Sequence, residues 1–272
     1  MINSISNRQV KEILKLQKQP KYRRSTGLFV AEGLKMLTEA AENGCLVKLY
    51  ISGTVAGKDN ERLEKLCMSC SFETVTDNIF KQLSDTVTTQ GVLGIIKQPS
   101  YNITDILNCK KHMWLLLDNI QDPGNLGTIM RTAEGAGMSA VIMGKGTADL
   151  FNPKTVRSTM GAIFRMPFIY TDDITETIKI IKNKGFNIYG AAMEGSKAYD
   201  QADYTKGAGI VIGNEANGIS GRVLGYVTEK IHIPMEGKLE SLNAAVAAAV
   251  IMYEAARQKR GCINISLHNY NK

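Results

Sequence analysis

The sequence lacks the features that mark membrane proteins, disulfide scaffolds and metal sites. No run of about 18 apolar residues occurs among its 272 residues, so we expect no transmembrane helix. Its five cysteines are odd in number and irregularly spaced, which favours a reduced cytosolic protein. Cys67 and Cys70 form an isolated CxxC pair and the three histidines lie far apart, so no metal site is predicted. The N-terminus has no apolar core of the kind found in signal peptides.

Two short glycine motifs do not predict a nucleotide site. Residues 135–140 fit GxGxxA, but they close a predicted helix and precede a strand, whereas the dinucleotide fingerprint follows a strand and opens a helix. The stretch Gly144-Lys-Gly-Thr is too short for a phosphate-binding loop. We therefore expect neither NAD nor ATP chemistry.

What the sequence does carry is positive charge near its N-terminus. The formal net charge is +7, and seven Lys or Arg residues fall within the first 24 positions, opposed there only by Glu12. A solvated helix face is the alternative, but charge of one sign over so short a stretch indicates contact with nucleic acid. The candidate RNA-binding residues are Lys11, Lys21, Arg23 and Arg24.

Residues 1–98 read as a small α/β domain, because helical and extended patterns alternate. We expect strands at 29–30, 46–51, 72–75 and 92–97, and helices at 5–17, 33–41, 61–67 and 78–83. The polar stretch 99–110, which follows Gln98-Pro99, is the predicted linker. Residues 59–90 match no motif, and their role stays open.

From residue 111 to 272 the strands are apolar throughout, as parallel strands covered on both faces should be. We expect strands at 113–118, 139–143, 167–170, 186–192, 208–213 and 229–233, and helices at 125–137, 153–160, 173–184, 219–223 and 241–258. The last helix is rich in alanine and starts at Ser241, a good N-cap. Its alanines predict close helix packing, either inside the subunit or across a dimer.

Three polar segments follow three of these strands. They are residues 125–131, residues 212–219, and Ile233-Pro-Met together with Ser241-Leu-Asn243. Ligands of open α/β sheets bind beyond the carboxyl ends of the strands, so the three segments predict one composite site. Asn125 is expected to cap its helix. Arg131, six residues later, is not on the same helical face, and a non-helical start would be needed to bring it near; pairing with Glu134 or another carboxylate is the alternative.

Together the segments resemble the three motifs of the SpoU-type RNA ribose 2′-O-methyltransferases of the SPOUT superfamily. The likeness covers the chain: residues 111–258 resemble the catalytic domain, and residues 21–33 resemble a substrate-binding domain of ribosomal-protein-like fold. The resemblance implies an α/β fold with an RNA-binding domain at 1–98, a linker at 99–110 and a methyltransferase domain at 111–272. That last domain would be a Rossmann-like parallel sheet tied in a deep trefoil knot.

The resemblance also implies S-adenosylmethionine as cofactor and assigns site residues. The catalytic set would be Arg131, Asn125, Glu215, Ser241 and Asn243, and the cofactor would touch Gly213, Ile233, Leu242, Ala191, Ala192, Met193, Ile212 and Met235. A guanidinium is effectively always protonated, so electrostatic stabilisation by Arg131 is favoured over a role as base.

The resemblance further implies a cytoplasmic homodimer that joins through the methyltransferase domain and acts on RNA. The candidate dimer contacts are Ala244, Ala248 and Ala255. The expected substrate is 23S ribosomal RNA. Transfer RNA, an antibiotic-resistance site in ribosomal RNA, and a non-catalytic RNA-binding role are the alternatives.

Overall fold

The computed structural model describes residues 1–269 except 58, 85 and 87, with side chains as far as Gly261. The chain folds into two compact units. The first unit joins Met1–Pro99 to Asp149–Phe164, and the second joins Ser100–Ala148 to the chain from Arg165 onward. In the part of the chain that is described, no helix has both the length and the apolar composition needed to cross a bilayer.

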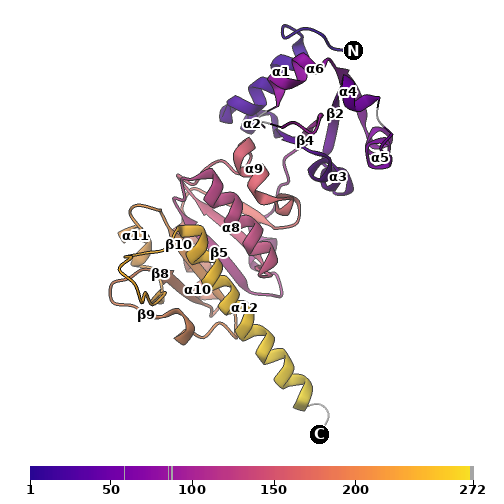
Figure 1. The fold of residues 1–272 in the computed structure, drawn as a ribbon. Coiled ribbons are helices and arrows are strands. Elements are labelled where there is room, and N and C mark those ends of the chain that lie inside the picture. Colours follow the sequence, from indigo (N-terminus) through magenta and orange to yellow (C-terminus); the bar gives the residue numbers. More distant parts are fainter. Residues whose placement is uncertain (58, 85, 87, 270–272) are drawn as a thin grey trace. The chain divides into compact units, whose positions relative to one another are not determined.

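The first unit contains a four-stranded sheet of order β1-β4-β2-β3, in which β4 is antiparallel to β1 and β2 while β2 and β3 are parallel. Figure 1 labels its two central strands, β4 and β2. The strands are β1 (Leu28–Glu32), β2 (Leu46–Ser52), β3 (Ser71–Val75) and β4 (Val92–Lys97). The helices are α1 (Arg8–Lys18), α2 (Pro20–Thr26), α3 (Leu34–Glu42), α4 (Gly53–Ala56), α5 (Glu61–Ser69) and α6 (Asp77–Leu83). Every element predicted for this region is confirmed, and α2 and α4 were not predicted because neither spans enough turns to show a periodic pattern.

A segment from the middle of the chain, residues 149–164, packs into the first unit. It carries α9 (Pro153–Thr159) and a 3₁₀ turn, η1 (Ala162–Phe164). The Phe29 ring on β1 lies 5.0 Å from the Phe151 ring and 6.3 Å from the Phe164 ring, measured between centroids. Sequence periodicity predicted α9 but not its partner, since the aromatic contacts join residues more than 120 positions apart.

Arg23 is inside this unit rather than on its surface. Only 1% of the residue is exposed, and its Nε and Nη2 donate to Asp149 Oδ2 at 2.9 and 2.6 Å. Its Nη1 donates to the carbonyl oxygens of Leu16 and Gln17. All three guanidinium nitrogens are thereby occupied, so the predicted RNA contact at Arg23 is corrected: this arginine joins α1, α2 and residue 149. Lys11, Lys21 and Arg24 are exposed.

The second unit is built on a parallel seven-stranded sheet of order β7-β6-β5-β10-β8-β11-β9. The strands are β5 (Met113–Asp118), β6 (Ala140–Gly144), β7 (Phe168–Thr171), β8 (Asn187–Ala191), β9 (Lys197–Ala198), β10 (Ala208–Gly213) and β11 (Glu229–His232). The helices are α7 (Ile103–Leu107), α8 (Pro123–Gly135), α10 (Ile174–Asn183), α11 (Gly221–Leu224) and α12 (Ala244–Asn269), with a 3₁₀ turn η2 (Tyr199–Gln201). The predicted α/β class with a parallel sheet is confirmed.

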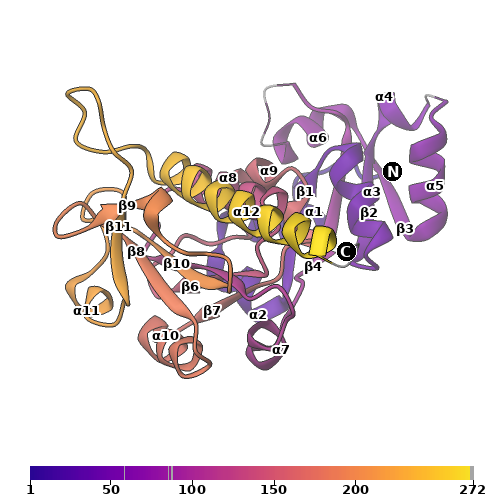
Figure 2. The same cartoon turned by 90° about the horizontal axis from the view of Figure 1, so that it is seen from below.

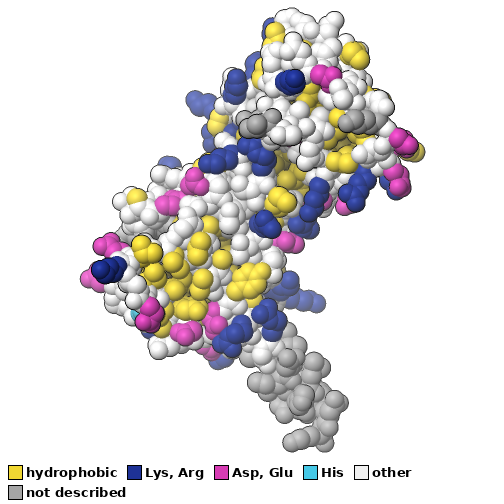
Figure 3. All heavy atoms as spheres, viewed as in Figure 1, with side chains coloured by type: hydrophobic (Ala, Val, Ile, Leu, Met, Phe, Trp, Pro, Cys, Tyr) yellow, Lys and Arg dark blue, Asp and Glu magenta, His cyan; other side chains and the backbone are white. Residues whose placement is uncertain are grey.

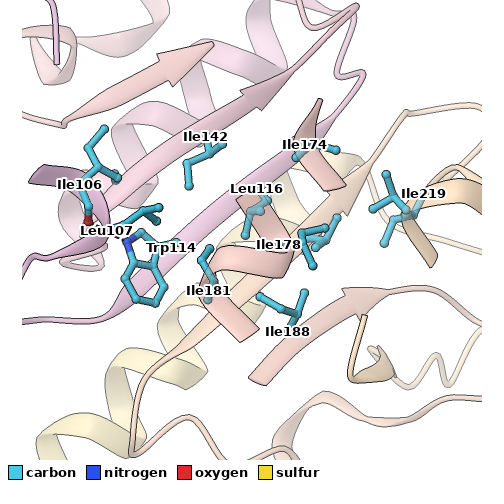
Figure 4. Packing of buried hydrophobic residues seen from close by; sticks show 13 residues of the cluster. Ile106, Leu107, Trp114, Leu116, Ile142, Ile174, Ile178, Ile181, Ile188 and Ile219 are labelled. Atoms are coloured by element: carbon cyan, nitrogen blue, oxygen red, sulfur yellow. Dashed lines mark hydrogen bonds between the residues drawn. The ribbon is translucent and has the colours of Figure 1, made fainter. Parts of the chain in front are cut away.

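Helices cover both faces of this sheet, which explains the uninterrupted apolar strands. Figure 2 shows α8 and α12 on one face, and α7 and α10 on the other. On the α10 face, Trp114 and Leu116 of β5 pack among isoleucines of α10 and of neighbouring strands (Figure 4). The stretch expected to be a linker contains α7, whose Ile106 and Leu107 are buried in this core, and Trp114 Nε1 donates to the Ile106 carbonyl at 2.9 Å.

The alanine face of α12 packs within its own subunit. Ala248 and Ala255 are fully buried, and α12 lies against α8 and β10. The predicted dimer contact at these two alanines is therefore wrong, since small side chains here let α12 approach its neighbours closely. Ala244 is half-buried.

Candidate functional site

A pocket of ≈ 250 Å³ opens in the second unit, beyond the carboxyl ends of β8, β10 and β11. Its walls are the residues that follow these strands, together with the first turn of α12. Apolar walls with a few polar groups are typical of small-molecule sites. All eight residues predicted to touch the cofactor line it: Ala191, Ala192, Met193, Ile212, Gly213, Ile233, Leu242 and Met235.

Glycine at position 213 is required by the way the loop after β10 folds back on itself. The N–H groups of Asn214 and Gly218 each donate to the other residue's carbonyl at 2.9 Å. A Cβ on Gly213 would lie 2.2 Å from backbone atoms of Gly218 and Ile219, closer than real Cβ atoms approach. The loop therefore presents backbone, not a side chain, at this edge of the pocket.

Glu215 is held as a carboxylate at the pocket wall. Its Oε1 accepts from Asn125 Nδ2 at 3.0 Å and from the Asp122 N–H at 3.1 Å, while Oε2 accepts from the Gln121 N–H at 3.1 Å. Burial by itself would raise the pKa of Glu215, but these hydrogen bonds to the ionised form outweigh it and the pKa lies below its usual value. Glu215 thus fastens the loop after β10 to the start of α8.

Asn243 extends this network to the C-terminal helix. Its Nδ2 donates to Asn125 Oδ1 at 3.0 Å, and its Oδ1 accepts from the N–H groups of Ala245 and Val246. Asn243 therefore caps α12, which begins at Ala244; the prediction that Ser241 is the cap is wrong. Ser241 is exposed and lines the pocket.

The first turn of α8 also differs from the prediction. The helix begins at Pro123, and Asp122 Oδ1 accepts from the Asn125 N–H at 2.7 Å. Asp122 is the N-cap, and Asn125 lies inside the first turn with its amide free to bridge Glu215 and Asn243. The predicted cap was Asn125, although Asp followed by Pro-Gly is a good N-cap signal in the sequence.

Arg131 stands apart from the other four predicted catalytic residues. Because α8 is helical from Pro123, the non-helical start that would have brought Arg131 near Asn125 does not exist. Arg131 is exposed and does not line the pocket. Glu134 pairs instead with Arg165, whose Nε is 3.1 Å from Glu134 Oε1. Among the described residues the side chain of Arg131 has no hydrogen bond or ion pair.

Comparison with known proteins agrees with this arrangement. The model of the SpoU rRNA methylase family matches residues 112–253, and the model of the MRM3-like substrate binding domain matches residues 7–94. The chain is 32% identical over 253 residues to the 23S rRNA (guanosine(2553)-2′-O)-methyltransferase RlmP of Bacillus subtilis, covering 93% of this chain and 97% of that protein.

Solved structures agree as well. The SpoU methyltransferase AviRb of Streptomyces viridochromogenes in complex with AdoMet superposes with a TM-score of 0.85 at 25% identity, over 93% of this chain and 98% of that one. An AdoMet-bound rRNA methyltransferase of Sinorhizobium meliloti gives a TM-score of 0.84 at 30% identity, over 94% and 97%. The chain therefore belongs to the SpoU rRNA methylase family and is an RNA ribose 2′-O-methyltransferase that uses S-adenosylmethionine.

Proposed function

We propose that this protein methylates the 2′-hydroxyl of one nucleotide in 23S ribosomal RNA. The observation that carries the proposal is the hydrogen-bonded set Glu215–Asn125–Asn243, which joins the three polar segments beside the pocket. The substrate follows from the B. subtilis relative, which is named for 23S rRNA and matches along nearly its whole length.

The pocket residues suit the cofactor. S-adenosylmethionine supplies a methyl group carried on a positively charged sulfur. The backbone at Gly213, Ile233 and Leu242 offers N–H and C=O groups for a heterocycle, and the apolar walls exclude water from the site. The Glu215 carboxylate adds negative charge to the same wall.

Asn125, Asn243 and Ser241 would orient the ribose, and Arg131 would stabilise its developing alkoxide. Both asparagine amides are already fixed by hydrogen bonds, so they are preorganised to position a hydroxyl. A guanidinium stays charged in proteins, so Arg131 would act by stabilising negative charge on the attacking oxygen and the adjacent phosphate.

The isolation of Arg131 supports a homodimer in which it serves the partner's site. Thr128, Arg131 and Gly135 form the exposed face of α8, and Val246 and Tyr253 of the adjoining α12 are each 49% exposed. Figure 3 shows apolar side chains gathered over α12. We assign the dimer contact to this exposed face of α8 and α12, in place of the contact predicted at the buried alanines. In a two-fold symmetric dimer the same face of each subunit would take part.

Three finer features of the protein are part of the proposal. The segment from Ile233 to Asn243 would thread through a loop to form the trefoil knot, which the match to SpoU structures over 93% of the chain supports. The first unit would bind the RNA and the second would carry the reaction. The enzyme would act in the cytoplasm, where its RNA is.

The test is to map 2′-O-methyl groups in RNA from a strain that lacks the gene and from the same strain carrying it on a plasmid. We expect one ribose in 23S rRNA to lose its methyl group in the deletion and regain it with the plasmid. If the deletion strain instead loses a methyl group from transfer RNA, the substrate is transfer RNA and not 23S rRNA. Loss of resistance to a ribosome-binding antibiotic, without a change in housekeeping sites, would support the resistance alternative.

The exposed basic side chains of α1 should supply much of the RNA affinity. Arg8, Lys11, Lys15 and Lys18 recur at helical spacing and are exposed or half-exposed. Replacing all four by Gln should weaken RNA binding and reduce the slope of log K against log salt by up to about 3.6, since each lost phosphate contact removes about 0.7–0.9. The measurement is RNA binding at several salt concentrations.

A matched control removes three positive charges from the second unit, at Lys179, Lys182 and Lys184 on and after α10. Its salt slope should stay near that of the wild type. If the slope is unchanged in the α1 variant and reduced in the α10 variant, the RNA-binding surface lies on the second unit instead.

A further inference from the structure

The turn after β8 forms one wall of the cofactor pocket, and a histidine from the next strand in the sheet holds it. His232, the last residue of β11, has Nδ1 2.8 Å from Ser196 Oγ. Ser196 Oγ in turn lies 2.6 Å from the Met193 carbonyl oxygen. Met193 and His232 both line the pocket, so two hydrogen bonds in series connect two of its walls.

The direction of both bonds follows from the number of protons. A carbonyl oxygen cannot donate, so the contact at 2.6 Å takes the one proton of the Ser196 hydroxyl. The hydroxyl oxygen must then accept from the imidazole, which requires a proton on His232 Nδ1. The relay runs from His232 Nδ1–H to Ser196 Oγ–H to the Met193 carbonyl.

The backbone holds both ends of the turn at Ile231 of β11, because the Ala192 N–H donates to the Ile231 carbonyl and Lys197 of β9 pairs with Ile231. The relay ties together the residues within the turn. Between residues 193 and 196, as far as the chain is described, no backbone hydrogen bond does so. Gly195 has φ +63°, the left-handed value that lets the chain reverse there. Met193 is 57% exposed at the pocket, so its placement depends on the Ser196 side chain more than on packing.

We propose that Ser196 and His232 are a positioning pair that holds the Met193 wall and thereby sets the affinity for S-adenosylmethionine. The proposal rests on the assignment of this pocket to the cofactor. Without the relay the turn samples open arrangements, and each bound molecule must first order it again. The chemical step itself uses other groups, and Ser196 does not line the pocket, so kcat at saturating cofactor should not change in Ser196→Ala.

The experiment measures the Kd for S-adenosylmethionine by calorimetry in four single variants and one double variant. Ser196→Ala removes both hydrogen bonds of the relay, and His232→Leu removes the one to Ser196. Each should raise the Kd about tenfold, because the Met193 carbonyl is held in place only while the relay is complete. Ser196→Thr keeps the hydroxyl, and His232→Asn puts an amide donor where Nδ1 stood, so both should restore most of the affinity. The double variant Ser196→Ala/His232→Leu should match either single loss, because the two residues act in one relay.

Steady-state kinetics of Ser196→Ala separates positioning from general damage: KM for S-adenosylmethionine should rise while kcat and KM for RNA stay near wild type. A Kd unchanged in Ser196→Ala, or losses that add in the double variant, would overturn the pair. Ala192→Trp, which fills the pocket, tests the underlying assignment: if it binds the cofactor as tightly as wild type, the pocket is wrong and not the pair alone.

Discussion

Arg131→Ala should lower kcat for methyl transfer by about 10²–10³-fold, the usual loss when a group that stabilises a developing oxyanion is removed. The Kd for S-adenosylmethionine should stay within about twofold of wild type, because Arg131 is outside the pocket wall in its own chain. Stability should also be unaffected, since the side chain is exposed and forms no ion pair among the described residues. Single-turnover transfer of labelled methyl and calorimetry with the cofactor measure the two effects.

Two matched substitutions sharpen this result. Arg165→Ala removes the same charge from the same unit, where the guanidinium pairs with Glu134, and should retain most of the activity. Arg131→Lys keeps the charge without the planar fork and should recover only part of the rate. Turnover by Arg131→Ala within about threefold of wild type would mean that this arginine has no role in the reaction.

Mixing two inactive variants should restore activity if Arg131 serves the partner's site. In a heterodimer of Arg131→Ala and Ala192→Trp, one site would combine the intact pocket of the first chain with the intact arginine of the second. The other site would carry both defects. By symmetry the heterodimer should show about half the wild-type rate per dimer, whereas both parent homodimers stay nearly inactive.

The heterodimer is obtained by co-expressing the chains with different tags and purifying through both. If Arg131 acts on the site of its own chain, each site of the heterodimer carries one defect and neither is active. An inactive heterodimer would therefore mean that Arg131 acts in cis. Adding Tyr253→Glu to both chains is the control for the proposed dimer contact. Tyr253 is exposed in the single chain, and a charge that dimerisation would bury there should prevent the two chains from associating. Retained rescue in that control would move the dimer contact away from α12.

The positions of the apolar runs along the chain were enough to predict the parallel sheet and one composite site beyond its strand ends. Apolar runs such as 113–118 and 208–213 have no polar face, which follows from their burial between two helix layers. The residues just beyond these strands must then lie at one edge of the sheet. The resemblance to the SpoU family, and not this pattern, assigned Ala192, Gly213 and Ile233 to the cofactor, and all three line one pocket.

The sequence could not decide whether a residue is exposed or buried when its pattern is compatible with both. Arg23 belongs to a basic stretch, yet the partner that buries it, Asp149, is 126 residues away. The alanines of α12 are compatible with helix packing inside the subunit or between subunits. In the structure Ala248 and Ala255 are buried inside the subunit, where α12 packs against α8.

The tertiary structure also decided where Arg131 lies relative to Asn125. A regular helix from Pro123 separates Arg131 from Asn125. Asp122 before Pro-Gly is a local signal for that helix start, whereas the Glu215 carboxylate that accepts the Asp122 N–H is 93 residues away in sequence. Strand positions and strand-end residues are local properties of a chain and were readable from it. Burial of a charge and the inward face of a helix depend on contacts between distant residues, and those exist only in the folded protein.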